Sequence, residues 1–214
     1  MTIIINDGIS IDSGVTITSE PIAPAGGTKF DSSYVGPYIN LINNNTTAYN
    51  FAPGTSSVLT NTVLTEVSKV MISFVMDIYG GGGASDNFIG VGNISTTLTD
   101  YLGANANSVG LAAYGTYFVN GSATVTGLPT WQANGDIIDL AVDTLHNYLW
   151  IRVNGGVWNN HLTDNPSEDT GGLALPVGLT IPALTIYGES NASQFTIAPT
   201  SAYPIPDGYT FLGS

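Results

Sequence analysis

The sequence has 214 residues, a formal net charge of −13, three basic residues against 16 acidic ones, and no cysteine. This charge balance excludes nucleic-acid binding, which needs a cationic surface, and disfavours contact with anionic membranes. Without cysteine, neither disulfide bonds nor thiolate metal sites can hold the fold.

The composition favours short strands joined by turns. The chain carries 26 glycines and 11 prolines, 43% hydrophobic residues and 9% charged ones, which predicts an all-β protein. Its length suits one well-buried domain, alone or with an arm. No apolar run approaches the ~20 residues of a membrane span, and the first residues lack the pattern of a signal peptide. We therefore expect no membrane insertion.

The first 20 residues read as an extended β arm. Alternating aliphatic residues are interrupted by Asp-Gly and Ser-Gly turns, and the pattern ends too early for a free-standing solenoid. The apolar positions of this predicted assembly arm are Ile3, Ile5, Ile9, Ile11, Val15 and Ile17. Because strands with an apolar face recruit partners, the arm should either complete a sheet of its own domain or dock on another subunit.

A Pro/Gly-rich linker over residues 21–28 should separate the arm from a compact domain at residues 29–214. The strongest strand signal in the first half of this domain covers residues 63–79. The glycines that follow it at 80–83 predict a hairpin loop rather than a phosphate cradle, since no lysine follows and no helix is indicated.

Further strands are predicted at residues 88–92, at 108–118 as one or two strands, at 179–187 and at 194–197. With the others, this gives roughly ten strands joined by short links. The predicted architecture is a β-sandwich of two antiparallel sheets.

The segment from Gly135 to Asn160 predicts a hairpin. Apolar residues alternate over 137–142 and again over 148–153, with residues 144–147 as the link. Asn154 and the two glycines after it tolerate positive φ, so the chain should turn there and return as a strand through Val157 and Trp158.

This hairpin also holds the acidic candidates for chemistry. A two-residue period places Asp139 and Asp143 on one face and Asp136 on the other, but the sequence lacks the spaced glutamates of a glycosidase strand. We expect turn and surface roles for these aspartates. His146 and His161 lie in polar turns, and no Gly-x-Ser-x-Gly motif accompanies them.

The loop at residues 164–169 offers oxygen ligands for Ca²⁺, yet its spacing matches no calcium-loop motif, so a solvated acidic loop is expected. The sequence therefore predicts no catalytic residue, no bound cofactor and no metal site.

An aromatic-basic face is the candidate binding surface. Tyr148, Trp150 and Arg152 share the side of their strand opposite the aliphatic residues, and Trp158 follows beyond the turn. These residue types dominate interface hot spots and sugar-stacking surfaces. The alternative is that loops and the arm cover this face and Arg152 pairs with an acid.

The order of these segments resembles the SPRY (B30.2-like) domain, a concanavalin-like jelly roll, over residues 63–211. The similar segments include VSKVMISFVMDI, FIGVG, VGLAAYG, the Gly135-Asp136 strand that ends at Asp143, and a strand that ends in Asn154-Gly155. The segments WIRVNGGVWNN and AYPIPDGY resemble the corresponding sequences of SPRY-like domains in bacteriophage virion proteins. Eukaryotic SPRY domains often accompany RING modules, and none is present here.

The resemblance implies a binding module rather than an enzyme. It suggests a non-catalytic virion structural protein, either a capsid decoration protein or a component of the tail or another appendage, which contacts other virion proteins and itself as a homo-oligomer. The alternative is a lectin-like module that binds host-surface glycans through Trp150 and Trp158. A third hypothesis is a lyase or glycosidase that uses Asp139 and Asp143.

Overall fold

The computed structural model describes residues 27–80, 86–188 and 193–214. The predicted arm, with its six apolar positions, and the linker up to residue 26 lie outside the described residues. None of the described residues forms a helix long and apolar enough to cross a membrane.

Fifteen strands and two short 3₁₀ turns make up the described fold. The strands are β1 (Phe30–Val35), β2 (Ile39–Ile42), β3 (Thr47–Asn50), β4 (Gly54–Thr60), β5 (Lys69–Ile78), β6 (Phe88–Gly92), β7 (Ser108–Ala112), β8 (Thr116–Val119), β9 (Ser122–Thr126), β10 (Ile137–Asp143), β11 (Tyr148–Val153), β12 (Leu173–Ala174), β13 (Ile181–Gly188), β14 (Gln194–Ile197) and β15 (Thr210–Phe211). The 3₁₀ turns are η2 (Trp158–Asn160) and η3 (Pro166–Glu168).

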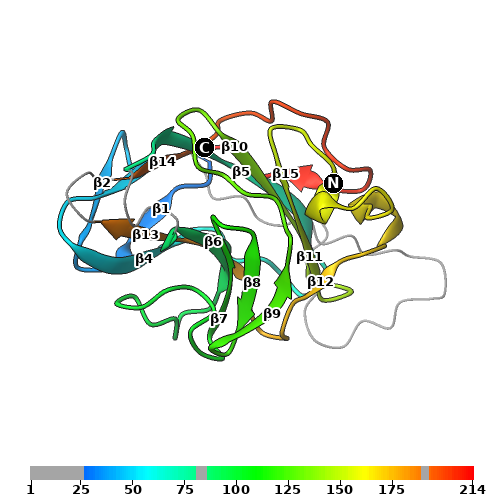
Figure 1. Ribbon diagram of the computed structural model, residues 1–214, viewed down its shortest axis with the longest axis horizontal. Coiled ribbons are helices and arrows are strands. Elements are labelled where there is room, and N and C mark those ends of the chain that lie inside the picture. The colour runs from blue at the N-terminus through cyan, green and yellow to red at the C-terminus, as the bar shows by residue number, and fades with distance from the viewer. Residues whose placement is uncertain (1–26, 81–85, 189–192) are drawn as a thin grey trace, which may run out of the picture.

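The strands form two sheets that face each other, as Figure 1 shows. The first sheet has the order β1-β4-β13-β6-β7-β8-β9, and the second has the order β12-β11-β10-β5-β14-β3-β2. All neighbours on these two paths are antiparallel, and β15 adds a short parallel pairing to the start of β5. The predicted all-β, two-sheet jelly-roll sandwich is confirmed.

The main core lies between the sheets and follows the predicted two-residue period. In β5, Ile72 and Phe74 point inward, and Ile138 and Leu140 do so in the neighbouring β10, all fully buried. Ile89 of β6 contributes from the opposite sheet. The alternation of apolar residues in the sequence is therefore enough to identify the inward side chains, because successive side chains along a strand point to opposite sides of a sheet.

Both outer surfaces of the sandwich are also partly covered. Residues 93–107 lie on the first sheet, where Gly110 brings its backbone so close to Leu102 that a Cβ at Gly110 would overlap the Leu102 carbonyl oxygen. Leu102 joins Phe88 and Ala112 in a second apolar cluster on this outer side. Residue 110 must therefore be glycine for the covering segment to approach the sheet this closely.

Two predicted strands have different bounds in the structure. The long strand expected from residue 63 begins at Lys69, because Ser68 closes a turn: its hydroxyl accepts a hydrogen bond from the Thr65 amide at 2.9 Å, and its own amide donates to Thr144 Oγ1 at 2.8 Å. The predicted return strand through Val157 and Trp158 is wrong. Asn159 adopts a left-handed φ of 50°, so the chain forms η2 there.

The first described residues of the chain pack into the domain. Thr28 is fully buried, its amide donates to the Gly213 carbonyl at 2.7 Å, and its hydroxyl bonds that of Thr62 at 3.0 Å. The described start of the chain therefore packs against its C-terminal end.

Candidate functional site

Most of the predicted aromatic-basic face is buried. Trp150 is 0% exposed, Arg152 6% and Trp158 9%, whereas Tyr148 is 36% exposed. The expectation of an open face is therefore wrong for Trp150, Arg152 and Trp158. Residues 157–172 and the C-terminal segment 199–212 cover this side of the second sheet. The predicted pairing of Arg152 with an acid is confirmed, and the arm expected over the same face lies outside the described residues.

Arg152 fixes the C-terminal segment to the sheet. Its Nε donates to Asp139 Oδ2 at 2.7 Å, and its terminal nitrogen donates to the Pro204 carbonyl at 2.7 Å. The guanidinium lies 4.4 Å from the centroid of the Trp158 ring and 5.8 Å from that of Tyr203. A charged hydrogen bond and stacking on aromatic faces are the contacts that a buried guanidinium needs.

Asp139 is fully buried, contrary to the surface role expected for it. Its second oxygen accepts a hydrogen bond from the Ser73 hydroxyl on the neighbouring strand β5. Asp139 and Arg152 stand opposite each other on β10 and β11. The pair therefore links two strands, and both carboxylate oxygens are engaged.

The segment 157–172 is held by two further side chains of the sheet surface. The indole N–H of Trp150 donates to the Thr170 carbonyl at 2.7 Å. The Asn159 amide group accepts from the Ile151 backbone N–H at 2.9 Å and donates to the Gly171 carbonyl at 2.8 Å. Trp150 and Asn159 thus act as structural anchors for this loop.

A carboxylate–histidine cluster of Lys69, Asp143, His146 and Asp169 lies at the other end of the same strands. Lys69 Nζ is 3.2 Å from Asp143 and 2.6 Å from Asp169, and His146 Nδ1 is 2.8 Å from Asp143 and 3.3 Å from Asp169. Asp143 is fully buried, so its predicted surface role is also wrong. His146 is exposed, as expected, and so is His161.

Contacts within this cluster shift two pKa values. Burial raises the pKa of Asp143, but hydrogen bonds from His146 and Lys69 outweigh it and lower the pKa below the ordinary 3.8. Burial lowers the pKa of Lys69, but hydrogen bonds to Asp169 and Asp143 outweigh this and raise it above 10.5. Both shifts favour the charged forms, as expected for an ion pair.

The cluster contains possible metal ligands. One ligand atom from each of Asp143, His146 and Asp169 lies within 4.8 Å of the others. The Lys69 ammonium already bonds both carboxylates, so a divalent ion would have to displace it. This arrangement fits an internal ion-pair network better than a metal centre. In the acidic loop at residues 164–169, Asp164 forms hydrogen bonds with Asn159 and His161, and Asp169 forms one with Lys69.

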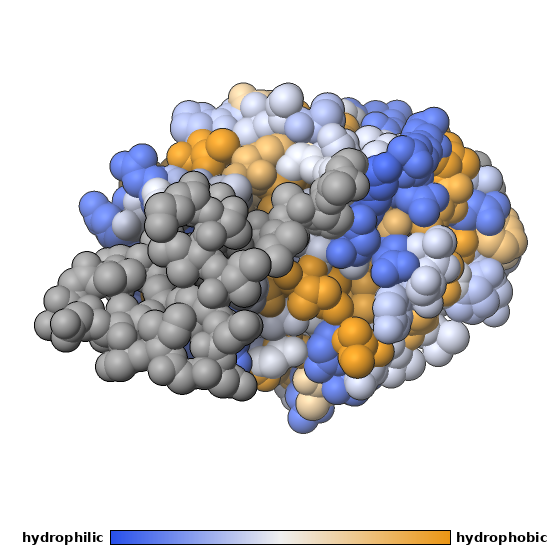
Figure 2. Space-filling view, turned by 180° about the vertical axis from the view of Figure 1, so that it is seen from behind, coloured by the Kyte–Doolittle hydropathy of each residue, from blue (hydrophilic) through white to orange (hydrophobic). Residues whose placement is uncertain are grey.

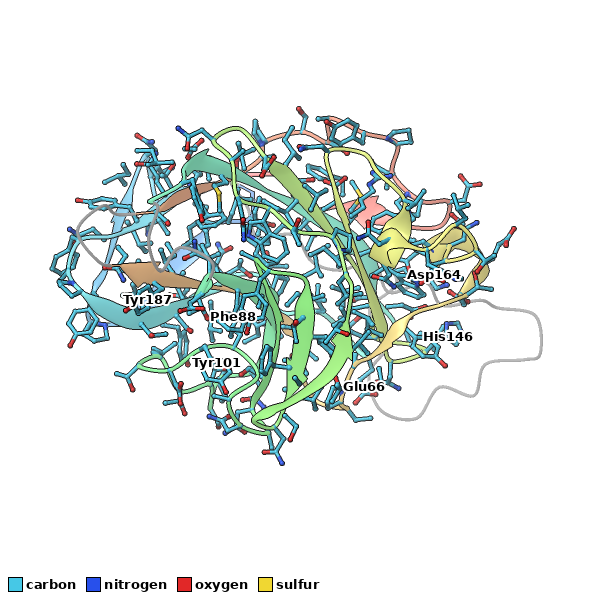
Figure 3. The ribbon with its side chains drawn as sticks, in the orientation of Figure 1. Glu66, Phe88, Tyr101, His146, Asp164 and Tyr187 are labelled. Atoms are coloured by element: carbon cyan, nitrogen blue, oxygen red, sulfur yellow. The ribbon has the colours of Figure 1, made fainter. Side chains whose placement is uncertain are left out.

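A different group of side chains forms the most distinctive hollow on the described surface, on the outer side of the first sheet. Its volume is about 290 Å³, and five of its lining residues are aromatic. We call it the aromatic hollow, and its lining residues are Phe88 of β6, Tyr101 of the covering segment 93–107, Tyr114 of the β7–β8 turn, Phe118 of β8, Tyr187 of β13, Thr55 of β4 and Asp86. Figure 3 places Phe88, Tyr101 and Tyr187 together, away from His146 and Asp164.

The rings of the hollow pack against one another in fixed orientations. Tyr101 stacks on Phe88 with centroids 5.0 Å apart, and Phe118 meets both rings edge-on at 5.7 and 5.8 Å. Tyr114 packs edge-on against Phe118 at 6.3 Å and is 42% exposed. Burial first, and then the nearby Asp86 carboxylate, raise the pKa of Tyr114, so its hydroxyl stays protonated at neutral pH.

The sequence contains no signal for this group, since its members come from five separate segments. The predicted strand FIGVG is confirmed, and the predicted stretch 108–118 contains β7 and most of β8, but nothing in the spacing of Tyr101 or Tyr187 connects them to Phe88. The rest of the surface offers scattered apolar side chains, and on the side shown in Figure 2 they lie in several separate groups between hydrophilic residues.

Comparison with solved structures defines the fold class. The SPRY domain of human HERC1 superposes with a TM-score of 0.62 at 17% identity, covering 78% of this chain and 96% of that one. The TRIM65 PSpry domain gives 0.60 at 10% identity, covering 81% and 93%, and a human SPRY domain gives 0.55 at 14%, covering 75% and 94%. No protein-family model matches the chain, and no curated protein does.

These similarities establish the fold. The chain is a SPRY-like β-sandwich, and the predicted resemblance is confirmed at that level. Its identity with each of these domains is low, so their partners do not transfer to it.

Breaking the buried Asp139–Arg152 pair should destabilise the domain. We expect Asp139→Asn and Arg152→Met each to lower the free energy of unfolding by about 3–5 kcal/mol, because each leaves a buried group without its partner. The double variant should lose less than the sum of the two, as measured by urea denaturation. Asp207→Asn, which removes a charge from the exposed tail, is the control. Additive losses in the double variant would show that the pair is not coupled.

The lowered pKa of Asp143 predicts acid sensitivity. Because the folded-state pKa lies below the unfolded value of about 3.8, the contribution to stability is present above that value and is lost as the pH falls through the folded pKa. The difference in unfolding free energy between the wild-type chain and Asp143→Asn, measured in urea from pH 6 to pH 2, should therefore shrink below about pH 4. A difference that stays constant over this range would contradict the lowered pKa of Asp143 in the folded state.

Proposed function

We propose that this chain is a non-catalytic structural protein of a bacteriophage particle, either a capsid decoration protein or a component of the tail or another appendage, which acts through protein–protein contacts. The proposal rests on the sequence resemblance to SPRY-like virion domains together with the apolar N-terminal segment. Its partners would be other virion proteins and further copies of the same chain.

One structural observation supports a binding role over catalysis. The candidate acid pair, Asp139 and Asp143, is fully buried, and each carboxylate is engaged by a cation of the same chain, Arg152 and Lys69 respectively. A general acid or nucleophile has to reach a substrate. These side chains hold loops and the C-terminal tail to the sheet instead, which leaves the glycosidase or lyase hypothesis without its best residues.

Glycan binding by a lectin-like module is the second candidate function, and the aromatic hollow is the described site at which it would take place. Aromatic faces beside a carboxylate can stack on a sugar ring and accept hydrogen bonds from its hydroxyls. The site proposed from sequence, Trp150 and Trp158, cannot serve, since both are buried. A glycan array probed with the wild-type chain and with Tyr114→Ala tests this function. A signal that Tyr114→Ala removes would support it, and a silent array would count against it.

The particle proposal predicts that the N-terminal segment drives assembly. Added to particles that lack the protein, chains without residues 1–20 should show at least tenfold lower occupancy, because the apolar edge that recruits a partner is gone. Occupancy would be measured by quantitative mass spectrometry of purified particles. Ile5→Ser with Ile11→Ser should reproduce the loss, and Thr16→Ser with Thr18→Ser in the same segment is the matched control. Unchanged occupancy after deletion would show that the arm has no assembly role.

A further inference from the structure

We propose that the aromatic hollow is a recognition site for a single arginine side chain presented by a protein partner. This inference rests on the proposed function, because it names the chemistry of one protein–protein contact that such a module would make. It is carried by three features of the hollow: the orientation of its rings, its carboxylate and its size.

The rings are inclined to one another at several angles, and because Phe88 is buried beneath them, Tyr101, Tyr114 and Phe118 provide accessible aromatic surface. Phe88 and Tyr101 are stacked with an interplanar angle of 26°, whereas Phe118 is inclined by 69° and 77° to them. Tyr114 is inclined by 84° to Phe118. A guanidinium is planar and weakly hydrated, so it stacks on such faces more readily than an ammonium does. The mutual packing of the rings holds them in place before a ligand arrives, which reduces the ordering cost of binding.

Asp86 supplies the charge that an arginine would pair with. Its side chain is exposed at the hollow, and within the described part of the chain it forms no ion pair. None of the basic residues lines the hollow, since Lys69 and Arg152 are engaged on the other sheet and Lys29 precedes β1. The chain therefore has no cation of its own at this site.

The net charge of the whole molecule also favours a cationic partner. At −13, the surface attracts a cationic partner and raises its rate of encounter. A contact between the Asp86 carboxylate and the guanidinium then adds a directional hydrogen bond. Charge complementarity thus selects a basic partner over an acidic or neutral one.

Size and polarity favour a side chain over a sugar. The volume of about 290 Å³ lies at the lower end of ligand pockets and suits one amino-acid side chain. Among the described residues of the lining there is no Asn, Gln, Lys or Arg, so these residues would offer a sugar hydroxyl groups and one carboxylate but no side-chain amide. An arginine needs acceptors alone, and the lining provides them.

The test uses Nα-acetyl-arginine amide as the probe and the isosteric, uncharged Nα-acetyl-citrulline amide as its control. Titrations of the full chain would be followed by NMR chemical shifts. We expect saturable binding of the arginine probe near the millimolar range, with shifts centred on Tyr101, Tyr114 and Phe118. Citrulline should bind at least tenfold more weakly, and arginine binding should weaken as salt is raised from 50 to 300 mM, since the contact is electrostatic.

Two variants separate the carboxylate from the rings. Asp86→Asn should weaken arginine binding about tenfold, and Tyr114→Ala should weaken it by a similar factor. Asp207→Asn removes the same charge from the opposite side of the sandwich and should leave binding within twofold. All three positions are exposed, so these variants should fold, which an unchanged thermal transition would verify.

Equal binding of arginine and citrulline, no saturable binding of either, or binding of galactose with the same residues shifted would each overturn the arginine assignment. Particle occupancy is measured separately with the same variants. If the wild-type chain occupies particles but does not bind the arginine probe, the inference fails and the proposed function stands. If the probe binds but the wild-type chain is absent from particles, the virion proposal fails and the site stands.

Discussion

The buried ion pair between Asp139 and Arg152 determines how the outer side of the second sheet is built. Arg152 donates hydrogen bonds to Asp139 on the neighbouring strand and to the Pro204 carbonyl of the C-terminal tail. Its guanidinium also contacts the rings of Trp158 and Tyr203. A buried charge without a partner is costly, so the sheet surface, the 157–172 segment and the C-terminal tail must keep this arrangement together. Trp150 and Asn159 add neutral anchors to the same covering. The side of the sandwich that looked suited to binding is thereby occupied by the chain itself.

The two sheets are covered in different ways. A buried ion pair and an apolar cluster hold the tail on the second sheet, whereas neutral hydrogen bonds from Ser57 and to Thr185, together with a close approach over Gly110, hold the segment 93–107 on the first sheet. That approach places Tyr101 against Phe88 and Phe118 and leaves a hollow next to Asp86. The buried carboxylates of the second sheet, Asp139 and Asp143, are engaged by Arg152 and Lys69, whereas Asp86 at the aromatic hollow forms no ion pair within the described residues. The site proposed for recognition therefore lies on the first sheet.

The fold alone assigns neither a function nor a partner. The solved SPRY domains share this framework at low identity, and function depends on the side chains that each chain places on it. The site proposed here has five aromatic rings and a carboxylate on a strongly acidic chain. Such a surface suits a basic partner, and an acidic, lysine-poor exterior is compatible with dense display on a particle.

Alternating apolar residues were enough to determine the all-β class, the β10–β11 hairpin and strands β6 and β14 with their predicted bounds, because the two-residue period of a strand is a local property. The same period correctly grouped Asp139 with Asp143 on one face of β10, and Trp150 with Arg152 on one face of β11, and the register of the two strands places both groups on the same side of the sheet. Whether that side meets water depends on segments 50 residues further along, since Pro204 and its neighbours pack there. The aromatic hollow likewise joins residues from Thr55 to Tyr187, and their proximity follows from sheet order. Sequence therefore determined which way each side chain points, and the tertiary structure decided what each one faces, because the covering of a sheet is a long-range contact.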